Sequence, residues 1–332
     1  MTGAAPFIGF HAAAEQFPPA DLVEFAVAAE AAGFDGLSIS DHFHPWQDNQ
    51  GHAGHAWMTL AAIGQRTRRL LLGTGVTCPI YRIHPAQVAH AFATLGVLYP
   101  GRVFLGVGTG EALNEVAAGG GWGPYRERAQ RLAEAIRLIR RLWTEDWVDF
   151  HGQYYHVRGA KLYDRPAESI PIYVAASGVQ SAGLAGREGD GWVTDHGTLR
   201  RGEAQKQAFV EAARAAGKDP DTMPRIVELW AVVGGRDEAL AAARLWQFIL
   251  AFPGIVDVAD PREVQRVAQE RVTLERVVDT WVVCPEPDDH VSAIHELAAA
   301  GASHIFLHSP QQDQRRVIEF YGRAVLPTVR GS

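Results

Sequence analysis

The chain has 332 residues, of which 47% are hydrophobic and 21% are charged. These values are ordinary for a globular protein and exclude a disordered chain or a coiled coil, and the length suits two domains or one α/β barrel. The formal net charge is −7 and the lysines are only Lys161, Lys206 and Lys218. Without a basic block to bind a phosphate backbone, we expect no nucleic-acid partner.

The amino terminus and the cysteines predict a cytoplasmic protein. Residues 1–6 lack the basic and long apolar segments of a signal peptide. The sequence has no run of about 18 apolar residues, so we expect no membrane span. Cys78 and Cys284 are too few for a disulfide framework, which favours a reducing compartment.

Strand and helix patterns alternate along almost the whole chain. The first half predicts strand 7–10, helix 18–33, strand 36–40, helix 57–67, strand 70–74, helix 85–98, strand 103–107 and helix 126–143. The second half predicts strand 172–175, helix 181–188, strand 192–194, helix 203–216, strand 226–233, strand 281–283, helix 288–300, strand 305–307 and a helix from 312. The alternation is interrupted at about 149–168, which has a hairpin pattern, and at about 236–276, which is mainly helical.

The strands are apolar on both faces and are separated by helices, which indicates a parallel sheet covered on both sides. About eight β/α units in a chain of this length favour a closed (β/α)8 TIM barrel over a doubly wound sheet. No linker-like composition occurs, so we expect one barrel domain over residues 1–332 with the two insertions. Active sites in this fold lie where the strands end and lead into the helices.

Polar and glycine-rich segments follow several of the predicted strands. They are residues 41–46, 73–79, 108–115, 176–178 and 308–310. Each segment alone reads as an ordinary turn, but together on one face of a barrel they favour an active site.

These segments also suggest a dinucleotide-binding motif and a zinc site, and both are disfavoured. The run Gly106-Val107-Gly108-Thr109-Gly110-Glu111 has Glu111 where a dinucleotide fingerprint needs its third glycine. A zinc hydrolase built on His42 and His44 would need further ligands, for which His196, His308 and Asp195 are available. A close pair among 14 histidines also arises by chance, so we expect no metal.

Several motifs together carry a family resemblance. They are residues 14–17, 40–46, 73–76, 106–115, 173–176, 189–191 and 313–316, of which Thr109-Gly110-Glu111-Ala112-Leu113-Asn114-Glu115 is the most specific. From about residue 7 to about residue 327 the chain resembles the luciferase-like oxidoreductases. More narrowly it is similar to their branch that uses the deazaflavin coenzyme F420, typified by the F420-dependent glucose-6-phosphate dehydrogenases.

The resemblance implies a luciferase-like barrel that holds F420 at the carboxyl ends of its strands. Asp41 would contact the ring system, and Gly75 with Val76 would support the ring in a bulge that has a cis peptide. Beside it, Thr109, Gly110 and Asn114 would bind the coenzyme. The coenzyme phosphate would lie on a helix N-terminus, which suits an anion, held by Ser177, Gly178, Gln180 and Ser181.

The resemblance also assigns the chemistry. His42 would act as general base, taking the proton of a substrate hydroxyl while hydride passes from the carbon to the deazaflavin C5, as an imidazole can near neutral pH. Trp46 would line the site and steady the transition state, Glu111 would serve the proton chemistry of the coenzyme ring, and Glu15 would tune His42. We expect a small-molecule substrate and a homodimer.

The sequence departs from the sugar-phosphate enzymes at the positions that would hold a phosphate. Asp195, Thr198 and Thr280 stand where those enzymes use threonine and cations, and the stretch 248–256 is apolar. A phosphate dianion buried without cations is costly. We therefore expect an uncharged alcohol or unphosphorylated sugar rather than glucose 6-phosphate. The alternatives are a reductase of a carbonyl or activated alkene that uses reduced F420, or a glucose-6-phosphate dehydrogenase proper. A further alternative, on another cofactor, is an FMN-dependent monooxygenase.

Overall fold

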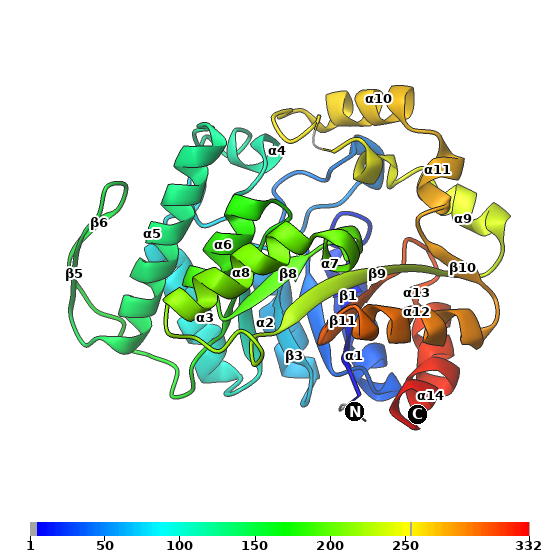
Figure 1. Ribbon diagram of the computed structural model, residues 1–332, viewed down its shortest axis with the longest axis horizontal. Coiled ribbons are helices and arrows are strands. Elements are labelled where there is room, and N and C mark those ends of the chain that lie inside the picture. Colours follow the sequence, from blue (N-terminus) through cyan, green and yellow to red (C-terminus); the bar gives the residue numbers. More distant parts are fainter. Residues whose placement is uncertain (1–4, 253, 332) are drawn as a thin grey trace.

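The computed structural model describes residues 5–252 and 254–331 and is built around a closed parallel barrel (Figure 1). Eight strands close the barrel, because β9 pairs with both β8 and β11. In barrel order the strands are β1 (Phe7–Ala12), β2 (Gly36–Ile39), β3 (Leu71–Thr74), β4 (Val103–Val107), β7 (Ile172–Ala175), β8 (Gly191–Thr194), β9 (Arg225–Val233) and β11 (His304–His308). The predicted (β/α)8 TIM barrel is confirmed.

Helices surround the barrel, and the predicted ones are present to within a few residues. They are α1 (Pro19–Ala32), α2 (Ala56–Arg66), α3 (Pro85–Leu98), α5 (Tyr125–Thr144), α6 (Val179–Glu188), α8 (Glu203–Ala215), α12 (Pro287–Ala299) and α13 (Gln314–Phe320). The π-helical turn η3 (Tyr321–Val325) and α14 (Leu326–Gly331) continue α13. Along α5 the apolar stripe of Leu132, Ile136 and Ile139 is buried, as its helical spacing requires. No helix in these ranges is long and apolar enough to cross a bilayer.

One of the nine predicted strands, β10 (Val282–Cys284), pairs with β9 beside the barrel instead of taking a place in it. This is possible because β9 is nine residues long. Its first part pairs with β8 and β11, and its last three residues extend past them to β10. The short helices η1 (Asp48–Gln50), α4 (Ala112–Glu115) and α7 (His196–Arg201) lie in loops after strands and were not predicted. They are too short to show a helical period.

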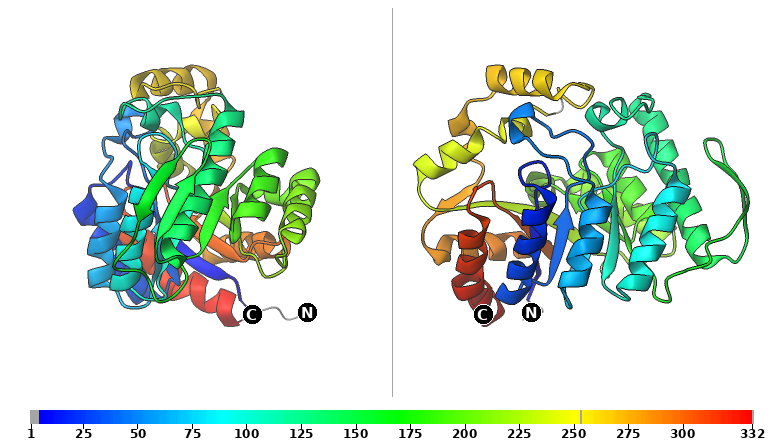
Figure 2. Two further views of the ribbon diagram at one scale, coloured as in Figure 1. Left: turned by 90° about the vertical axis from the view of Figure 1, so that its left-hand side faces the viewer. Right: turned by 180° about the vertical axis from the view of Figure 1, so that it is seen from behind.

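The two predicted insertions have different structures. The first contains the antiparallel hairpin of β5 (Val148–His151) and β6 (His156–Ala160) beside α5. The second contains α9 (Arg236–Ala243), η2 (Gln247–Leu250), α10 (Pro261–Arg271) and α11 (Leu274–Val278); residue 253 lies outside the described residues. Figure 2 shows α10 over one end of the barrel, with α14 at the opposite end. The second insertion therefore covers the carboxyl ends of the strands.

The barrel interior is layered. At its amino-terminal side, Phe104, Tyr173, Ile226 and Phe306 form an apolar layer. Alternate residues of a strand face the same side, so Glu228 and Trp230 follow Ile226 into the interior. The next layer is therefore polar, and a cavity lies beyond it.

Candidate active site

A cavity of about 210 Å³ lies at the carboxyl ends of the strands, and we call it the central cavity. Its aromatic and aliphatic wall comes partly from the barrel and partly from the second insertion, and its other side is polar. The lining residues are His11, Glu15, Ser40, His42, Trp46, Gly75, Val76, Glu111, Glu228, Trp230, Trp246, Phe248, Ile249, Phe252 and His308. The structure thus brings together all four predicted catalytic residues and the predicted pair Gly75 and Val76.

Asn114 fixes the orientation of His42. Its Oδ1 accepts hydrogen bonds from the backbone N–H groups of Phe43 and His44, at 2.8 and 3.3 Å, which sets the direction of the amide. Its Nδ2 then donates to Nδ1 of His42 at 3.0 Å and to Oε2 of Glu111 at 3.2 Å. Nδ1 of His42 is therefore an acceptor, and a neutral His42 carries its proton on Nε2.

Glu15 lies against that second nitrogen. Nε2 of His42 is 3.4 Å from Oε1 of Glu15, and Oε2 of Glu15 accepts a hydrogen bond of 2.5 Å from the Ser40 hydroxyl. The side chain of Glu15 is almost fully buried, and each of its carboxylate oxygens has a polar partner within the protein. The pair of Glu15 and His42 can hold, donate or accept a proton at the cavity surface.

Trp46 both packs and lines the cavity. Its ring stacks on Phe248 at 4.8 Å and 13°, and it meets Phe252 edge to face at 4.9 Å. The ring of His42 is 5.3 Å away. The same indole therefore attaches the second insertion to the loop that carries His42.

Asp41 lies beside the cavity and braces it. Its carboxylate accepts hydrogen bonds from Trp57 Nε1 at 3.0 Å, Thr77 Oγ1 at 2.5 Å and Arg82 at 3.0 Å. Arg82 also pairs with Glu115 at 3.2 Å. Burial alone would lower the pKa of Arg82, but Asp41 and Glu115 outweigh that effect and raise it. This network, which holds the loops after β2, β3 and β4 together, was not predicted.

The backbone around the expected coenzyme region has two unusual features. The peptide bond between Gly75 and Val76 is cis, as predicted. Gly110 has φ +73°, and a β-carbon there would collide with the sulfur of Cys78. Thr109 precedes this turn and is half-buried. Only glycine fits at position 110.

Ser177, Gly178, Gln180 and Ser181 lie at the start of α6. Gly178 is the N-cap, and the Ser181 side chain accepts a hydrogen bond from its N–H at 3.1 Å. Ser177, Gly178 and Gln180 are exposed and Ser181 is half-buried. An exposed first helical turn can bind an anion.

The three predicted substrate residues lie apart from the central cavity. Asp195 is the N-cap of α7, and its carboxylate accepts hydrogen bonds from both the N–H and the hydroxyl of Thr198. Neither residue lines the central cavity. Thr280 lines a second cavity of about 210 Å³, the side cavity, together with His196, Arg200 and Asp279. Glu228 and Trp230 line both cavities.

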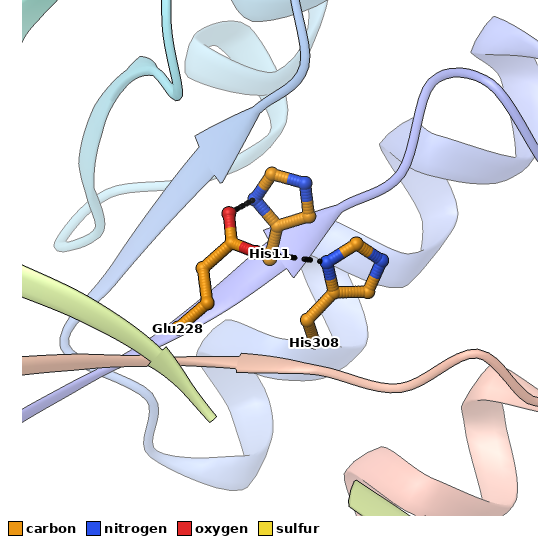
Figure 3. Close-up of side chains that lie close together, drawn as sticks. All are labelled: His11, Glu228 and His308. Carbon is orange, nitrogen blue, oxygen red and sulfur yellow. Dashed lines mark hydrogen bonds and ion pairs between the residues drawn. The ribbon is translucent and has the colours of Figure 1, made fainter. Parts of the chain in front are cut away.

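The polar layer beneath the central cavity contains His11 and Glu228, which were not predicted, and His308, which was named only as an available zinc ligand (Figure 3). Nδ1 of His11 is 3.5 Å from one carboxylate oxygen of Glu228, and Nδ1 of His308 is 3.2 Å from the other. Nε2 of His308 is buried and has no hydrogen-bond partner. The available signal was a glutamate inside the otherwise apolar strand 226–233, where the period of two points it inward.

These three residues, rather than His42 and His44, are the described group with metal-ligating atoms within 4.8 Å of one another. However, the rings of His11 and His308 stack at 4.4 Å and 29°. The Nδ1 atoms already have partners, since that of His11 is 2.8 Å from the Ser38 hydroxyl and that of His308 is 3.2 Å from Glu228. We therefore interpret the group as a hydrogen-bond network.

Burial sets the charge in this network. It lowers the pKa of His11 to about 4, outweighing the neighbouring carboxylates, so His11 is neutral near pH 7. Burial alone would raise the pKa of Glu228, but the adjacent imidazoles of His11 and His308 outweigh it and lower that pKa to about 2. Glu228 is thus a carboxylate anion between two cavities.

The fold and site define a barrel oxidoreductase of the luciferase-like class. Residues 4–304 match the family model described as luciferase-like monooxygenase, and the chain belongs to this family.

Among its relatives, the chain is 50% identical over 95% of its length to an F420-dependent hydroxymycolic acid dehydrogenase of Mycobacterium tuberculosis (strain ATCC 25618 / H37Rv), covering 86% of that protein. It is 45% identical to an F420-dependent glucose-6-phosphate dehydrogenase of Mycolicibacterium gilvum (strain PYR-GCK), with 97% and 98% of the two chains covered. A solved F420-dependent secondary alcohol dehydrogenase in complex with an F420-acetone adduct is 35% identical, with a TM-score of 0.92 over 98% and 99% of the chains.

Proposed function

We propose that this protein is an F420-dependent oxidoreductase that moves a hydride between the carbon of an uncharged alcohol and the deazaflavin. The observation that carries the proposal is the central cavity, where His42, Glu15, Trp46 and Glu111 meet an aromatic wall. Relatives named as F420-dependent dehydrogenases, matched over nearly the full chain, support the coenzyme.

The residues present fit the coenzyme. Gly75 and Val76 line the central cavity, where the coenzyme ring would lie, and the exposed start of α6 suits the coenzyme phosphate. Gly75, Val76, Thr109 and Asn114 would hold the ring region, Ser177 to Ser181 the phosphate, and Asp41 would brace the site. When bound, F420 supplies the hydride-accepting carbon.

We propose that His42 and Glu15 handle the hydroxyl proton as one unit. His42 was expected to be the base, but Asn114 occupies its Nδ1 lone pair and leaves an N–H on Nε2. His42 then holds the substrate oxygen as a donor, and the adjacent Glu15 carboxylate supplies the electron pair that receives the proton. Trp46 packs against the substrate, and Glu111 serves the coenzyme ring.

The electrostatics of the cavity favour an uncharged substrate. Glu15, Glu111 and Glu228 contribute carboxylates, and none of the described lining residues is lysine or arginine. A phosphate there would be desolvated beside anions with no cation to pair with it. The wall of Phe248, Ile249 and Phe252 instead suits an aliphatic body. The predicted roles of Asp195, Thr198 and Thr280 then concern only a substrate that extends beyond this cavity.

The test is a direct comparison of substrates on F420-loaded protein. We expect a secondary alcohol such as 2-propanol or a longer homologue to bleach the deazaflavin absorbance, with kcat/KM at least about tenfold above that of glucose 6-phosphate. A tenfold preference for glucose 6-phosphate would contradict the uncharged substrate. Tight FMN binding without F420 binding would favour the monooxygenase alternative.

We further propose a cytoplasmic homodimer. The two cysteines are free, which supports a reducing compartment. Met58 on α2 and Val97 and Leu98 on α3 are exposed apolar side chains on neighbouring helices, which supports an interface there. Light scattering of the purified protein tests the dimer, and a monomer mass would contradict it.

A further inference from the structure

A series of polar side chains, joined by two hydrogen bonds and two longer ion-pair contacts, leads from His42 across the barrel to Glu228. Nε2 of His42 lies 3.4 Å from Oε1 of Glu15. Oε2 of Glu15 accepts a hydrogen bond of 2.5 Å from the Ser40 hydroxyl. From Ser40 it is 3.3 Å to Nε2 of His11, whose Nδ1 is 3.5 Å from Glu228. These five groups come from the loops after β1 and β2 and from β1 and β9.

The far end of this series reaches a different part of the surface. Glu228 retains 35% of its side-chain exposure, while His11 retains 3%. It lines the side cavity as well as the central one. Exposed residues border the side cavity, among them His196, Arg200 and Thr280. A proton on Glu228 can therefore reach water without passing the mouth of the central cavity.

We propose that Ser40, His11 and Glu228 form a proton relay that carries the substrate's hydroxyl proton from Glu15 to the side cavity. This inference rests on the proposed function. A substrate that fills a cavity of about 210 Å³ displaces water from it. Ser40, His11 and Glu228 all line the central cavity, and Glu228 also lines the side cavity, so the relay follows the polar side of the one to the other.

Each group in the relay can both accept and donate. A serine hydroxyl has one hydrogen and two lone pairs, and a neutral imidazole accepts at one nitrogen and donates from the other. His11 is neutral near pH 7 because burial lowers its pKa to about 4. The Ser38 hydroxyl, 2.8 Å from Nδ1 of His11, can pair with that nitrogen in either tautomer.

The transfer balances as follows. With F420 bound, the carbon-bound hydrogen would leave with its electron pair to the coenzyme, the alcohol carbon would be oxidised, and the hydroxyl proton would pass to Glu15. Glu15 gives its proton to Ser40, Ser40 gives its own to Nε2 of His11, and His11 gives the proton on Nδ1 to Glu228. Glu228 releases one proton to water in the side cavity. Exchange of the His11 tautomer and rotation of the Ser40 hydroxyl restore the starting state.

The charges around Glu228 suit a group that passes a proton on. His11 and His308 flank it inside the barrel, and His196, Arg200, Asp279 and Glu296 face the side cavity. Glu228 is therefore ionised at rest and holds a proton only briefly.

The first test replaces the Ser40 link with a matched pair of variants. Ser40→Ala removes the hydroxyl, and Ser40→Thr keeps it. We expect multiple-turnover oxidation of a secondary alcohol to fall about tenfold or more in Ser40→Ala and to remain near wild type in Ser40→Thr. Hydride transfer in the first turnover, followed by stopped-flow absorbance, should fall less than multiple turnover in Ser40→Ala, which also loses the hydrogen bond to Glu15. Added imidazole buffer should restore turnover of Ser40→Ala, because a small base replaces a missing relay but not a lost fold.

The second test addresses Glu228. Glu228→Gln keeps the shape but cannot hold a proton, and it should show the same slow, buffer-dependent turnover. Glu188→Gln, which removes a buried carboxylate that pairs with Arg137 on α5, is the control and should behave as wild type. In coenzyme-free protein, ¹⁵N NMR of His11 should show a neutral ring that exchanges between its two tautomers.

The outcomes separate this inference from the proposed function. Wild-type turnover in Ser40→Ala and Glu228→Gln, or equal loss of the first and later turnovers without buffer rescue, would overturn the relay. So would a His11 ring locked in one tautomer or protonated at both nitrogens. If none of the alcohols supports reduction of F420 by the wild type, the proposed function fails. The NMR result then decides on the relay by itself.

Discussion

Asn114 shows how one side chain can decide what a neighbouring residue does. Its amide is fixed by two backbone N–H groups, so His42 receives a hydrogen bond on Nδ1 and faces Glu15 with Nε2. A motif comparison assigns a role to His42 but carries no information about its tautomer. The hydrogen bonds of the folded site are needed to divide that role between His42 and Glu15.

The residue-scale prediction concerns this pair. His42→Ala and Glu15→Gln should each lower kcat for alcohol oxidation by about 10²–10⁴-fold, the usual range for a lost acid or base. F420 should still bind both variants. Quenching of tryptophan fluorescence measures this, because it reports binding rather than turnover. If Glu15→Gln turns over at a near-normal rate while His42→Ala is inactive, His42 alone takes the proton.

At the scale of elements, periodicity predicted most of the barrel, because long helices and apolar strands carry repeating patterns. It did not predict α4 or α7, which are shorter than two turns, or that β10 lies beside the barrel. Strand pairing depends on the register of β9 with three partners, which no local pattern encodes. His11 and Glu228 were missed for the same reason, since they are distant in sequence and meet only across the barrel.

The hairpin of β5 and β6 supplies the prediction at this scale. Glu134 on α5 accepts hydrogen bonds from the backbone N–H groups of Gln153, Tyr154 and Tyr155, at 2.8, 2.9 and 2.6 Å. Glu134→Ala should leave these donors unpaired and destabilise the hairpin by about 1–3 kcal/mol. Faster hydrogen exchange over residues 148–160 would be the measured result.

The control for the hairpin prediction is Glu145→Ala at the C-cap of the same helix. Glu145 retains 41% of its side-chain exposure and pairs with Arg141 four residues before it. Such surface pairs contribute little, so exchange in the hairpin should not change. Equal effects of the two substitutions would mean that Glu134 does not hold the hairpin.

For the whole molecule, buried histidines couple folding to acidity. Burial lowers the pKa of His304 to about 4 from 6.5, outweighing the nearby Asp35. Between these values the unfolded chain binds a proton that the folded chain does not. The free energy of unfolding therefore falls as pH decreases from about 6.5 to about 4.

A substitution outside the active site tests this coupling. His304 stacks on Phe7 at 4.5 Å, so His304→Phe keeps an aromatic ring in place. Between about pH 7 and about pH 5, the variant should lose about 1–2 kcal/mol less stability than wild type in urea unfolding. Parallel losses in the two proteins would show that His304 titrates alike in the folded and unfolded states.

The second insertion contributes Ile255, Val264 and Val277 to an apolar cluster, and it meets the barrel and its loops through apolar side chains such as Trp46, Leu113 and Val232. Such a segment can change its inner surface by substitution, or be exchanged for another, while the strands beneath keep their arrangement. In such a protein the substrate specificity and the catalysed reaction can evolve at separate rates. The second insertion could likewise be replaced by a different segment on the same barrel, with the contact to Trp46 kept. Such a replacement would change the substrate that the enzyme accepts without altering its catalytic residues.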